Sequence, residues 1–251
     1  MTPAAHHAIA HLAQAERLLL ATDFDGTVAP LRPDPMSVIA NPTTVRALES
    51  LATLPNTEVV VLSGRHLDGL MQVCPLREPV VLVGSHGAEQ TDGGLVLSDD
   101  DEAYLDSIEA TLMGLIADYP LAYIEVKPYQ RVVHVAHLAE VDPEAALGIL
   151  DAARQIETGG RPTTDGSNIV EFSAVEFTKG MWVERRKRDF TATLFAGDDV
   201  TDESVFPYLS HGDVGIKVGE GATGASLRLD TIDEMAAFYD SLSAARGAAT
   251  V

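Results

Sequence analysis

The sequence predicts an α/β protein in which a parallel β-sheet is interrupted by an inserted α+β domain. Short apolar runs that end in turns alternate with helical patterns over most of the chain, as in parallel sheets buried on both faces. The pattern changes between residues 95 and 178, where helical segments flank a hairpin-like segment. The length of 251 residues allows one large domain or two small ones.

The elements of the parallel-sheet domain follow in order. MTPAAHHAIAHLAQAER (1–17) fits a short surface helix, and we expect its histidines to be solvated. NPTTVRALESLATL (41–54) has helical apolar spacing behind an Asn/Pro/Thr start, and TDESVFPYLS (201–210) is a predicted helix with Thr201 as its N-cap. The predicted buried strands are LLLATDF (18–24), VVVLSG (59–64), VVLVG (80–84), TLFAG (193–197) and VGIKVG (214–219).

The insertion has a different pattern, with longer helices and a segment in which apolar and polar residues alternate as in an exposed hairpin. Its predicted elements are a helix at 98–119, an antiparallel hairpin at 122–137, a helix at 142–156, a polar turn at 159–168 and a strand at 168–177. We therefore place the parallel-sheet domain at 1–94 and 179–251, and the inserted domain at 95–178. The segments near 91–98, with Gly93 and Gly94, and near 174–179 are expected hinges.

Composition excludes several classes of partner. With 17 basic and 38 acidic residues the net charge is −21, which repels nucleic acid and anionic membranes, so neither is an expected partner. No apolar run reaches membrane-spanning length, and the N-terminus lacks the pattern of a signal peptide. The single Cys74 cannot form an intrachain disulfide and is expected to pack in the core. We expect a cytoplasmic protein with a small-molecule substrate, and the sequence carries no signal for an oligomeric state.

Acidic residues follow two of the predicted strands. Asp23 and Asp25 end the first strand, and Asp198, Asp199 and Asp202 follow the strand at 193–197. Ligands of open parallel sheets bind outside the carboxyl ends of the strands. Asp-Gly is also a common turn pair, so the first pair alone is equally compatible with a simple turn. Two acidic groups in one crevice repel each other without a cation, and their oxygen ligands favour Mg²⁺, which commonly partners substrate phosphate.

Two further residues supply positive or hydrogen-bonding groups for an anion. Ser63, in VVVLSGR, offers a hydroxyl and a glycine-loosened backbone to phosphate oxygens, and Lys179, in FTKG, offers an ammonium group. Taken singly, each is compatible with a turn serine or a surface lysine. Their occurrence at strand ends or helix starts, in order with both acidic groups, is hard to explain as coincidence.

The four motifs resemble those of haloacid dehalogenase-like phosphatases: D-x-D-G-T, S-G-R, a lone lysine and G-D-D-x-x-D. The resemblance implies a Rossmann-like parallel-sheet core with an inserted α+β cap, and an aspartyl-phosphate intermediate on Asp23. It implies Asp25 as the acid/base, which suits an alkoxide leaving group because that group needs a proton. It implies phosphate binding by Ser63, Gly64, Arg65 and Lys179, and Mg²⁺ binding by Asp23, the Asp25 carbonyl, Asp198, Asp202 and Asp199.

A closer resemblance covers about residues 18 to 240. DFDGTVAPL, VVLSGR, GSHGAE (84–89), KG (179–180), GDDVTDESVF (197–206) and VGIKVGEGAT (214–223) are similar to trehalose-6-phosphate phosphatases. This implies Mg²⁺-dependent hydrolysis of trehalose 6-phosphate, with the insertion at 95–178 as a cap that reads the disaccharide. The implied substrate-binding residues are His86 and Glu89 after a core strand, and Glu125, Lys127, His134, Asn168 and Glu171 in the cap.

One segment departs from the family pattern. Glu171 is followed by Phe172, Ser173 and Ala174, where the family commonly has Glu-x-Arg-Pro or Glu-x-Lys-Pro, and His137 falls near the place of a family arginine. The sugar preference therefore stays open between trehalose 6-phosphate and another ester, such as glucosylglycerol phosphate, mannosylphosphoglycerate or a related disaccharide phosphate. A phosphomutase shares the D-x-D opening, but the resemblance of GDDVTDE to trehalose-6-phosphate phosphatases favours a phosphatase over a phosphomutase. A silent sugar-phosphate sensor has no reason to keep the whole acidic and lysine set.

Overall fold

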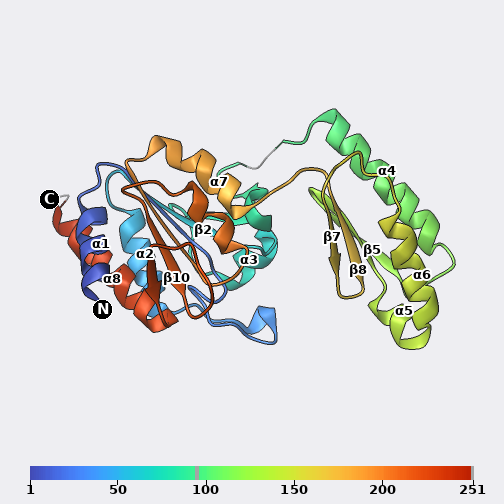
Figure 1. The fold of residues 1–251 in the computed structure, drawn as a ribbon, viewed down its shortest axis with the longest axis horizontal. Coiled ribbons are helices and arrows are strands. Elements are labelled where there is room, and N and C mark those ends of the chain that lie inside the picture. Colours follow the sequence, from blue (N-terminus) through green and yellow to red (C-terminus); the bar gives the residue numbers. More distant parts are fainter. Residues whose placement is uncertain (94–95, 250–251) are drawn as a thin grey trace. The chain divides into compact units, whose positions relative to one another are not determined.

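Two separate β-sheets organise the computed structural model, which describes residues 1–93 and 96–249 (Figure 1). A seven-stranded, mainly parallel sheet lies in the unit formed by Met1–Gly94 and Phe177–Val251, called here the core unit. A four-stranded antiparallel sheet lies in the unit Leu95–Glu176, called here the inserted unit. The predicted fold class is confirmed. Of the expected hinge glycines, Gly93 has a φ of 113°, and Gly94 lies outside the described residues.

The core sheet places the ends of three neighbouring strands at one edge. Its order is β11-β10-β9-β1-β2-β3-β4, and every pairing is parallel except β3 with β4. Leu20 of β1 lies opposite Val59 of β2 and Leu194 of β9, so the residues that follow these strands converge. The strands are β1 (Leu18–Thr22), β2 (Thr57–Leu62), β3 (Val81–Gly84), β4 (Glu89–Gln90), β9 (Ala192–Gly197), β10 (Val214–Val218) and β11 (Leu227–Leu229).

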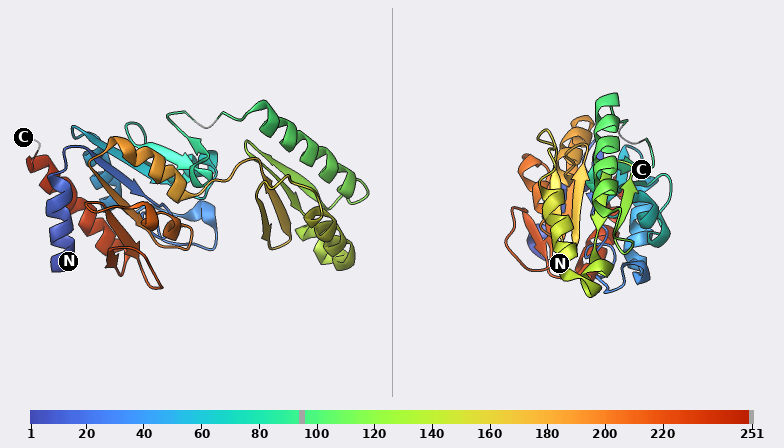
Figure 2. Two further views of the ribbon diagram at one scale, coloured as in Figure 1. Left: turned by 45° about the horizontal axis from the view of Figure 1, so that its top comes forward. Right: turned by 90° about the vertical axis from the view of Figure 1, so that its right-hand side faces the viewer.

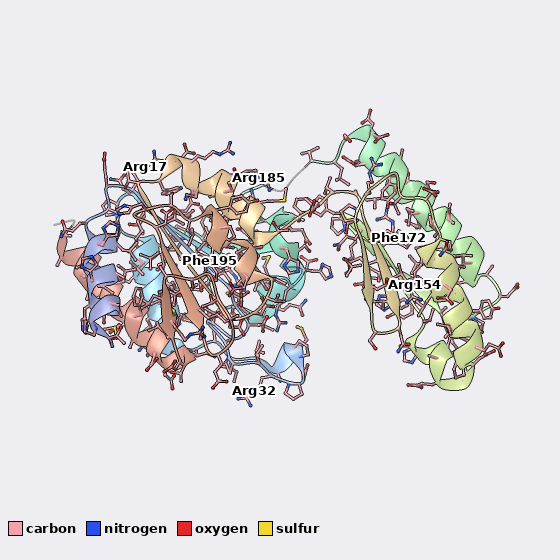
Figure 3. The ribbon with its side chains drawn as sticks, in the orientation of Figure 1. Arg17, Arg32, Arg154, Phe172, Arg185 and Phe195 are labelled. Atoms are coloured by element: carbon pink, nitrogen blue, oxygen red, sulfur yellow. The ribbon has the colours of Figure 1, made fainter. Side chains whose placement is uncertain are left out.

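Helices cover both faces of the core sheet, which explains why all five residues of β1 are buried (Figure 2). One face packs against α1 (Pro3–Ala13), α2 (Pro42–Ala52), α3 (Leu67–Val73) and α8 (Ile232–Ala249). The other face, which includes Phe195, packs against α7 (Lys179–Arg186) (Figure 3). Sequence signals fix the helix starts: Thr2 and Asn41 cap α1 and α2, and each is followed by a proline at the first helical position.

The inserted unit is a sheet with helices on one face. The sheet order is β5-β6-β8-β7, and Val133, Val170 and Phe172 (Figure 3) pack against the helices. Because side chains alternate along a strand, the opposite face carries polar groups. The elements are α4 (Asp99–Ile116), capped by Ser98 and Asp101 in a capping box, β5 (Tyr123–Lys127), β6 (Gln130–His134), α5 (Ala136–Val141), α6 (Pro143–Arg154), β7 (Thr163–Gly166) and β8 (Ile169–Ser173).

Some expected elements were wrong. Residues 201–210 form two short 3₁₀ turns, Asp202–Ser204 and Phe206–Tyr208, instead of one helix. Thr201 is the N-cap of the first of these turns, as predicted, but its side chain makes no capping hydrogen bond. Its backbone N–H and hydroxyl both donate to the carboxylate of Asp199 instead. The predicted polar turn at 159–168 contains strand β7, and α3, α5 and α8 had no counterpart among the predicted helices. Within the described ranges, no helix has both the length and the apolar character that crossing a membrane requires.

Candidate active site

A cavity of about 360 Å³ lies at the carboxyl edge of the core sheet. Its walls come from the turns after β1, β2, β3 and β9 and from the start of α7. Most core residues singled out from the sequence line it, whereas Asp202 and Glu89 do not. The lining residues are Asp23, Asp25, Leu31, Ser63, Gly64, Arg65, His86, Lys179, Asp198, Asp199 and Thr201.

Asp23 is fixed at the floor of the cavity. Its backbone N–H donates to the Ala196 carbonyl (2.8 Å), which extends the β1–β9 pairing by one residue. Its carboxylate accepts a hydrogen bond from Lys179 (Nζ to Oδ1, 2.6 Å) and is only 5% exposed. Burial raises the pKa of Asp23 well above its ordinary value, and the neighbouring carboxylates of Asp202 and Asp198 add to this, while Lys179 opposes it.

Lys179 is a buried cation that contacts two carboxylates of the site. It is the first residue of α7, whose N-cap Thr178 accepts a hydrogen bond from Met181 N–H (3.1 Å). Its Nζ donates to Asp23 and to Asp202 (Oδ1, 2.8 Å). Burial alone lowers the pKa of Lys179, but the two carboxylates outweigh burial and raise it, so the ammonium stays protonated.

Asp23, Asp198 and Asp202 form a group able to hold a metal ion. Each offers a carboxylate oxygen, and these oxygens lie within 4.8 Å of one another. The three carboxylates outnumber the ammonium groups of Lys179 and Lys217, which leaves an excess of negative charge. Burial together with Asp202 and Asp199 raises the pKa of Asp198 to about 6, although the two lysines oppose this. Gly26 is required here: its φ is 84°, and a Cβ on it would lie 2.0 Å from Asp198 Oδ2.

Asp202 and Asp199 hold the loop after β9 together. The Oδ2 atom of Asp202, which is fully buried, accepts the backbone N–H groups of Asp198 (2.9 Å) and Asp199 (3.0 Å). Asp199 Oδ1 accepts from Thr201 N–H (2.8 Å), Thr201 hydroxyl (2.7 Å) and Asp202 N–H (3.2 Å). Burial raises the pKa of Asp199, but these hydrogen bonds and the charge of Lys179 outweigh burial. The pKa of Asp199 is therefore below its ordinary value. Asp199 therefore orders the loop and is outside the three-carboxylate group.

Asp25 and Arg65 form a bidentate ion pair. Arg65 Nε donates to Asp25 Oδ2 (2.5 Å), and Nη2 donates to Oδ1 (2.7 Å). Both carboxylate oxygens of Asp25 are therefore engaged by one guanidinium group. This pairing was not predictable from the sequence, because the two residues are 40 positions apart and follow different strands.

Ser63, Gly64 and His86 line the cavity from the turns after β2 and β3. Ser63 N–H donates to Val83 O (2.8 Å) and His86 N–H donates to Ser63 O (3.0 Å), so the turns after β2 and β3 are joined. The imidazole of His86 packs on Gly64, where a Cβ would lie 2.7 Å from His86 Cε1. His86 itself has a φ of 56°, a strained conformation of the kind that recurs at functional sites.

Glu89 is committed to contacts within the core unit. Its Oε2 accepts Leu67 N–H (3.3 Å), the first N–H of α3, whose N-cap His66 makes no side-chain capping hydrogen bond. Its Oε1 accepts the hydroxyl of Ser85 and lies 3.6 Å from His66 Nδ1. Burial raises the pKa of Glu89, and these hydrogen bonds lower it by more. Glu89 thus caps α3 and fixes the loop that carries Arg65.

Lys217 is a site residue that the sequence reading missed. It lies inside β10, is 4% exposed and donates from Nζ to the Asp198 carbonyl. This hydrogen bond fixes the backbone that presents the Asp198 carboxylate. A lysine inside a strand of otherwise apolar residues is the signal that could have identified it, because buried lysines are rare without a partner.

Most of the predicted cap residues lie on the polar face of the inserted sheet and contact one another there. Lys127 Nζ donates to Glu171 Oε2 (3.0 Å) and lies 3.8 Å from Glu125 Oε2. Glu125 Oε2 also contacts His134 Nε2 (3.0 Å), whose ring stacks on Tyr123. Asn168 lies apart from this network: its φ is 61°, and its carbonyl accepts Val135 N–H (3.0 Å), which is a turn role.

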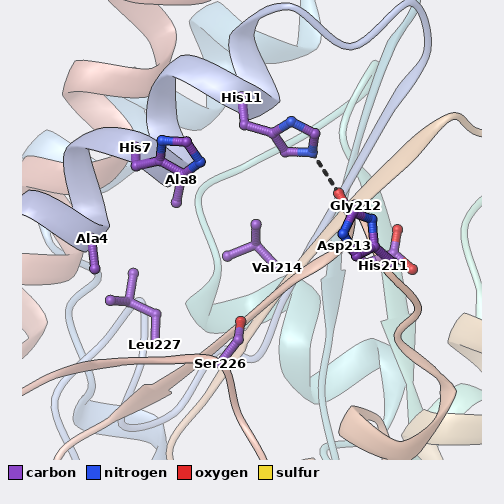
Figure 4. A pocket seen from close by; sticks show the side chains of 10 residues that line it. All are labelled: Ala4, His7, Ala8, His11, His211, Gly212, Asp213, Val214, Ser226 and Leu227. Carbon is purple, nitrogen blue, oxygen red and sulfur yellow. Dashed lines mark hydrogen bonds between the residues drawn. The ribbon is translucent and has the colours of Figure 1, made fainter.

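A second hollow of the core unit, about 290 Å³, lies between α1 and the start of β10 (Figure 4). His7, His11 and His211 stand around it, and His11 Nε2 donates to the Gly212 carbonyl (2.8 Å). Over the residues that the structure describes, these histidines do not join a metal-ligand group.

The trehalose-phosphatase family model matches residues 21–231. The chain belongs to the trehalose-phosphatase family. This confirms the resemblance inferred from the motifs. The match covers the whole inserted unit and the core unit from within β1 to the residue before α8.

Individual family members show the same likeness. The chain is 31% identical to a bifunctional trehalose-6-phosphate synthase/phosphatase of Thermoproteus tenax over 86% of its own length, but spans only 30% of that protein. It is 29% identical to the trehalose-6-phosphate phosphatase of Escherichia coli, with 89% of this chain and 85% of that protein covered. Among solved structures, Aspergillus fumigatus trehalose-6-phosphate phosphatase has the same fold, with a TM-score of 0.71, 21% identity, and 96% and 97% of the two chains covered.

Proposed function

We propose that this chain hydrolyses trehalose 6-phosphate to trehalose and phosphate through an aspartyl phosphate on Asp23. The observation that carries the proposal is the buried contact of Asp23 with Lys179, beside Asp198 and Asp202, in a cavity that also holds Asp25 and Ser63. The names of the family members support the substrate.

The residues present fit a divalent cation. Asp23, Asp198 and Asp202 supply hard oxygen donors, and their excess charge over Lys179 is what a bound Mg²⁺ would offset. When bound, Mg²⁺ would stabilise negative charge on the transferring phosphoryl group. We assign these three side chains and the Asp25 carbonyl to it.

The side chains of the site divide the reaction between them. Lys179 binds Oδ1 of Asp23, so we assign the attack on phosphorus to Oδ2. The bond from phosphorus to the sugar oxygen breaks, and the sugar oxygen leaves with the electron pair and takes a proton from the carboxyl group of Asp25. Ser63, Gly64 and Lys179 hold the phosphoryl oxygens. Asp25, now ionised, takes a proton from the water that attacks the phosphorus of the acyl phosphate, which releases phosphate and restores Asp23.

We assign sugar recognition to the inserted unit. Glu125, Lys127, His134 and Glu171 share its polar sheet face, where carboxylates accept hydrogen bonds from sugar hydroxyls and Lys127 donates them. In the core unit we assign His86, which lines the cavity, to the same substrate.

Cys74 is buried, and burial raises the pKa of its thiol to about 11. This suits the expected packing role of Cys74 and the cytoplasmic location that we propose for this chain.

Phosphate release from a panel of esters tests the proposal. The panel contains trehalose 6-phosphate, glucose 6-phosphate, sucrose 6-phosphate, glucosylglycerol phosphate and mannosylphosphoglycerate, each with Mg²⁺ and with EDTA. We expect Mg²⁺-dependent release with a preference for trehalose 6-phosphate, and none from a folded Asp23→Asn variant. Activity on another ester alone would overturn the substrate, and normal activity of Asp23→Asn would overturn the mechanism.

A further inference from the structure

We propose that Arg65 positions Asp25 for proton transfer to the leaving sugar and is not a ligand of the substrate phosphate. The inference rests on the proposed function, in which Asp25 protonates the sugar oxygen. It departs from the family resemblance, which places Arg65 with the phosphate ligands.

The first argument is the geometry of the pair. The Nε and Nη2 atoms of Arg65 donate to the two different oxygens of Asp25, at 2.5 and 2.7 Å. This parallel arrangement fixes the plane of the carboxylate, which is otherwise free to rotate about its last torsion. It uses the Nε–Nη2 edge of the guanidinium group, one of its two bidentate edges, and leaves a second lone pair on each carboxylate oxygen to carry the proton.

The second argument is that Arg65 is itself held from several directions. The backbone N–H of Arg65 donates to Ser63 Oγ (3.1 Å), and its backbone carbonyl accepts Ser85 N–H (2.7 Å). Its guanidinium lies 5.9 Å from the centre of the Phe24 ring. A Cβ on Gly84 would lie 2.8 Å from the Arg65 carbonyl, so β3 packs closely under this turn. The side chain is 14% exposed, compared with 26% for Asp25.

The third argument is that the site already has other groups for an anion. Lys179 and Ser63 lie in the same cavity, and the resemblance assigns both to the phosphoryl group. Loss of Arg65 would therefore leave phosphate binding largely in place. It would instead free the Asp25 carboxylate to turn away from the leaving oxygen.

The two roles for Arg65 differ in how they depend on the leaving group. A sugar alkoxide needs a proton as its bond to phosphorus breaks, whereas nitrophenolate does not. A residue that positions the acid therefore affects kcat/KM for a sugar phosphate much more than for p-nitrophenyl phosphate, because kcat/KM reports the steps up to the first bond cleavage. A phosphate ligand contributes to both esters equally.

The experiment measures kcat/KM for trehalose 6-phosphate and p-nitrophenyl phosphate, with Mg²⁺, in wild type, Arg65→Met and Arg65→Lys. Asp25→Asn is the reference for loss of the acid, and Ser63→Ala for loss of a phosphate ligand. We expect Arg65→Met to lower the value for trehalose 6-phosphate about 100-fold and for the aryl ester less than about 3-fold, as Asp25→Asn does. Arg65→Lys, which can donate to one oxygen, should recover part of the loss on the sugar ester.

A second readout follows the other half of the reaction. With p-nitrophenyl phosphate, Arg65→Met should release a burst of nitrophenolate equal to the enzyme concentration and then slow down, because Asp25 also activates the attacking water. The inhibition constant of orthophosphate should stay within about 3-fold of wild type. Thermal unfolding midpoints confirm that the variants compared are folded.

An equal loss on both esters, with weaker inhibition by orthophosphate, would overturn the positioning role and restore Arg65 to the phosphate ligands. The proposed function is judged separately, on wild type alone. If wild type prefers a different sugar phosphate from the panel, that ester replaces trehalose 6-phosphate in the comparison, and the ratio between sugar and aryl esters still decides the role of Arg65.

Discussion

Replacing Asp198 by Asn should make the metal-free protein more stable at neutral and alkaline pH, and should remove most of its stabilisation by Mg²⁺. The reason is the excess of carboxylates: Asp198 has Asp23 and Asp202 within the reach of one ion. The hydrogen bonds of residue 198 described above are made by its backbone, so an Asn side chain keeps them.

The magnitude follows from the pKa of Asp198, which burial and the neighbouring carboxylates raise from 3.8 to about 6. At about 1.4 kcal/mol for each pKa unit, the ionised carboxylate destabilises the fold by about 3 kcal/mol, and solvent screening of this half-buried group reduces that to about 1–2 kcal/mol. A carboxyl group whose pKa is raised by folding binds its proton more tightly in the folded state. Its contribution to stability is therefore lost as the pH rises through the folded pKa, and the gain from Asn appears above about pH 6 and disappears below about pH 4.

Thermal unfolding of wild type and Asp198→Asn in EDTA, at about pH 8 and about pH 4, measures this difference. We expect the variant to unfold about 2–8 °C higher at the alkaline pH and at the same temperature as wild type at the acidic pH. With Mg²⁺ at about 100 times its Kd, wild type gains about 2.7 kcal/mol and the order reverses. A variant less stable than wild type in EDTA at the alkaline pH would refute the electrostatic account.

Three further predictions concern the site, the sugar face and the core. Lys179→Met should abolish phosphate release and lower the free energy of unfolding in EDTA by about 3–5 kcal/mol, because Asp23 loses its buried cation; unchanged stability would contradict the pairing. Glu171→Gln should raise KM for trehalose 6-phosphate about tenfold, by weakening its contact with Lys127, and leave hydrolysis of p-nitrophenyl phosphate unchanged; equal effects on both esters would argue against a sugar contact. Arg246→Met should lower the free energy of unfolding by about 3 kcal/mol, because its buried guanidinium donates to carbonyls of separate segments, with kcat/KM unchanged; a variant as stable as wild type would contradict this.

The catalytic edge of the core sheet was predictable because parallel strands have a regular geometry. Asp23, Ser63 and Asp198 each follow an apolar run, and the carboxyl ends of parallel strands meet at one edge. Lys179 could be placed from its position at the start of an amphipathic helix. Chemistry and periodicity therefore pointed to the same residues.

Pairings between distant loops could not be predicted in the same way. The engagement of Asp25 by Arg65 and the capping of α3 by Glu89 depend on how the turns after β2 and β3 pack against each other. No periodicity carries that information. Strand β7 was missed because TTDG has the composition of a turn, and its pairing with β8 through the tertiary fold overrides that local preference.

The most direct test of the central claim is to look for phosphate on Asp23. The Asp25→Asn variant, mixed with Mg²⁺ and p-nitrophenyl phosphate and quenched in acid within the first turnover, is digested and its peptides are weighed by mass spectrometry. The proposed mechanism predicts one phosphoryl group on the peptide that contains Asp23, and none in Asp23→Asn treated in parallel. Release of nitrophenolate without phosphate on that peptide would contradict it.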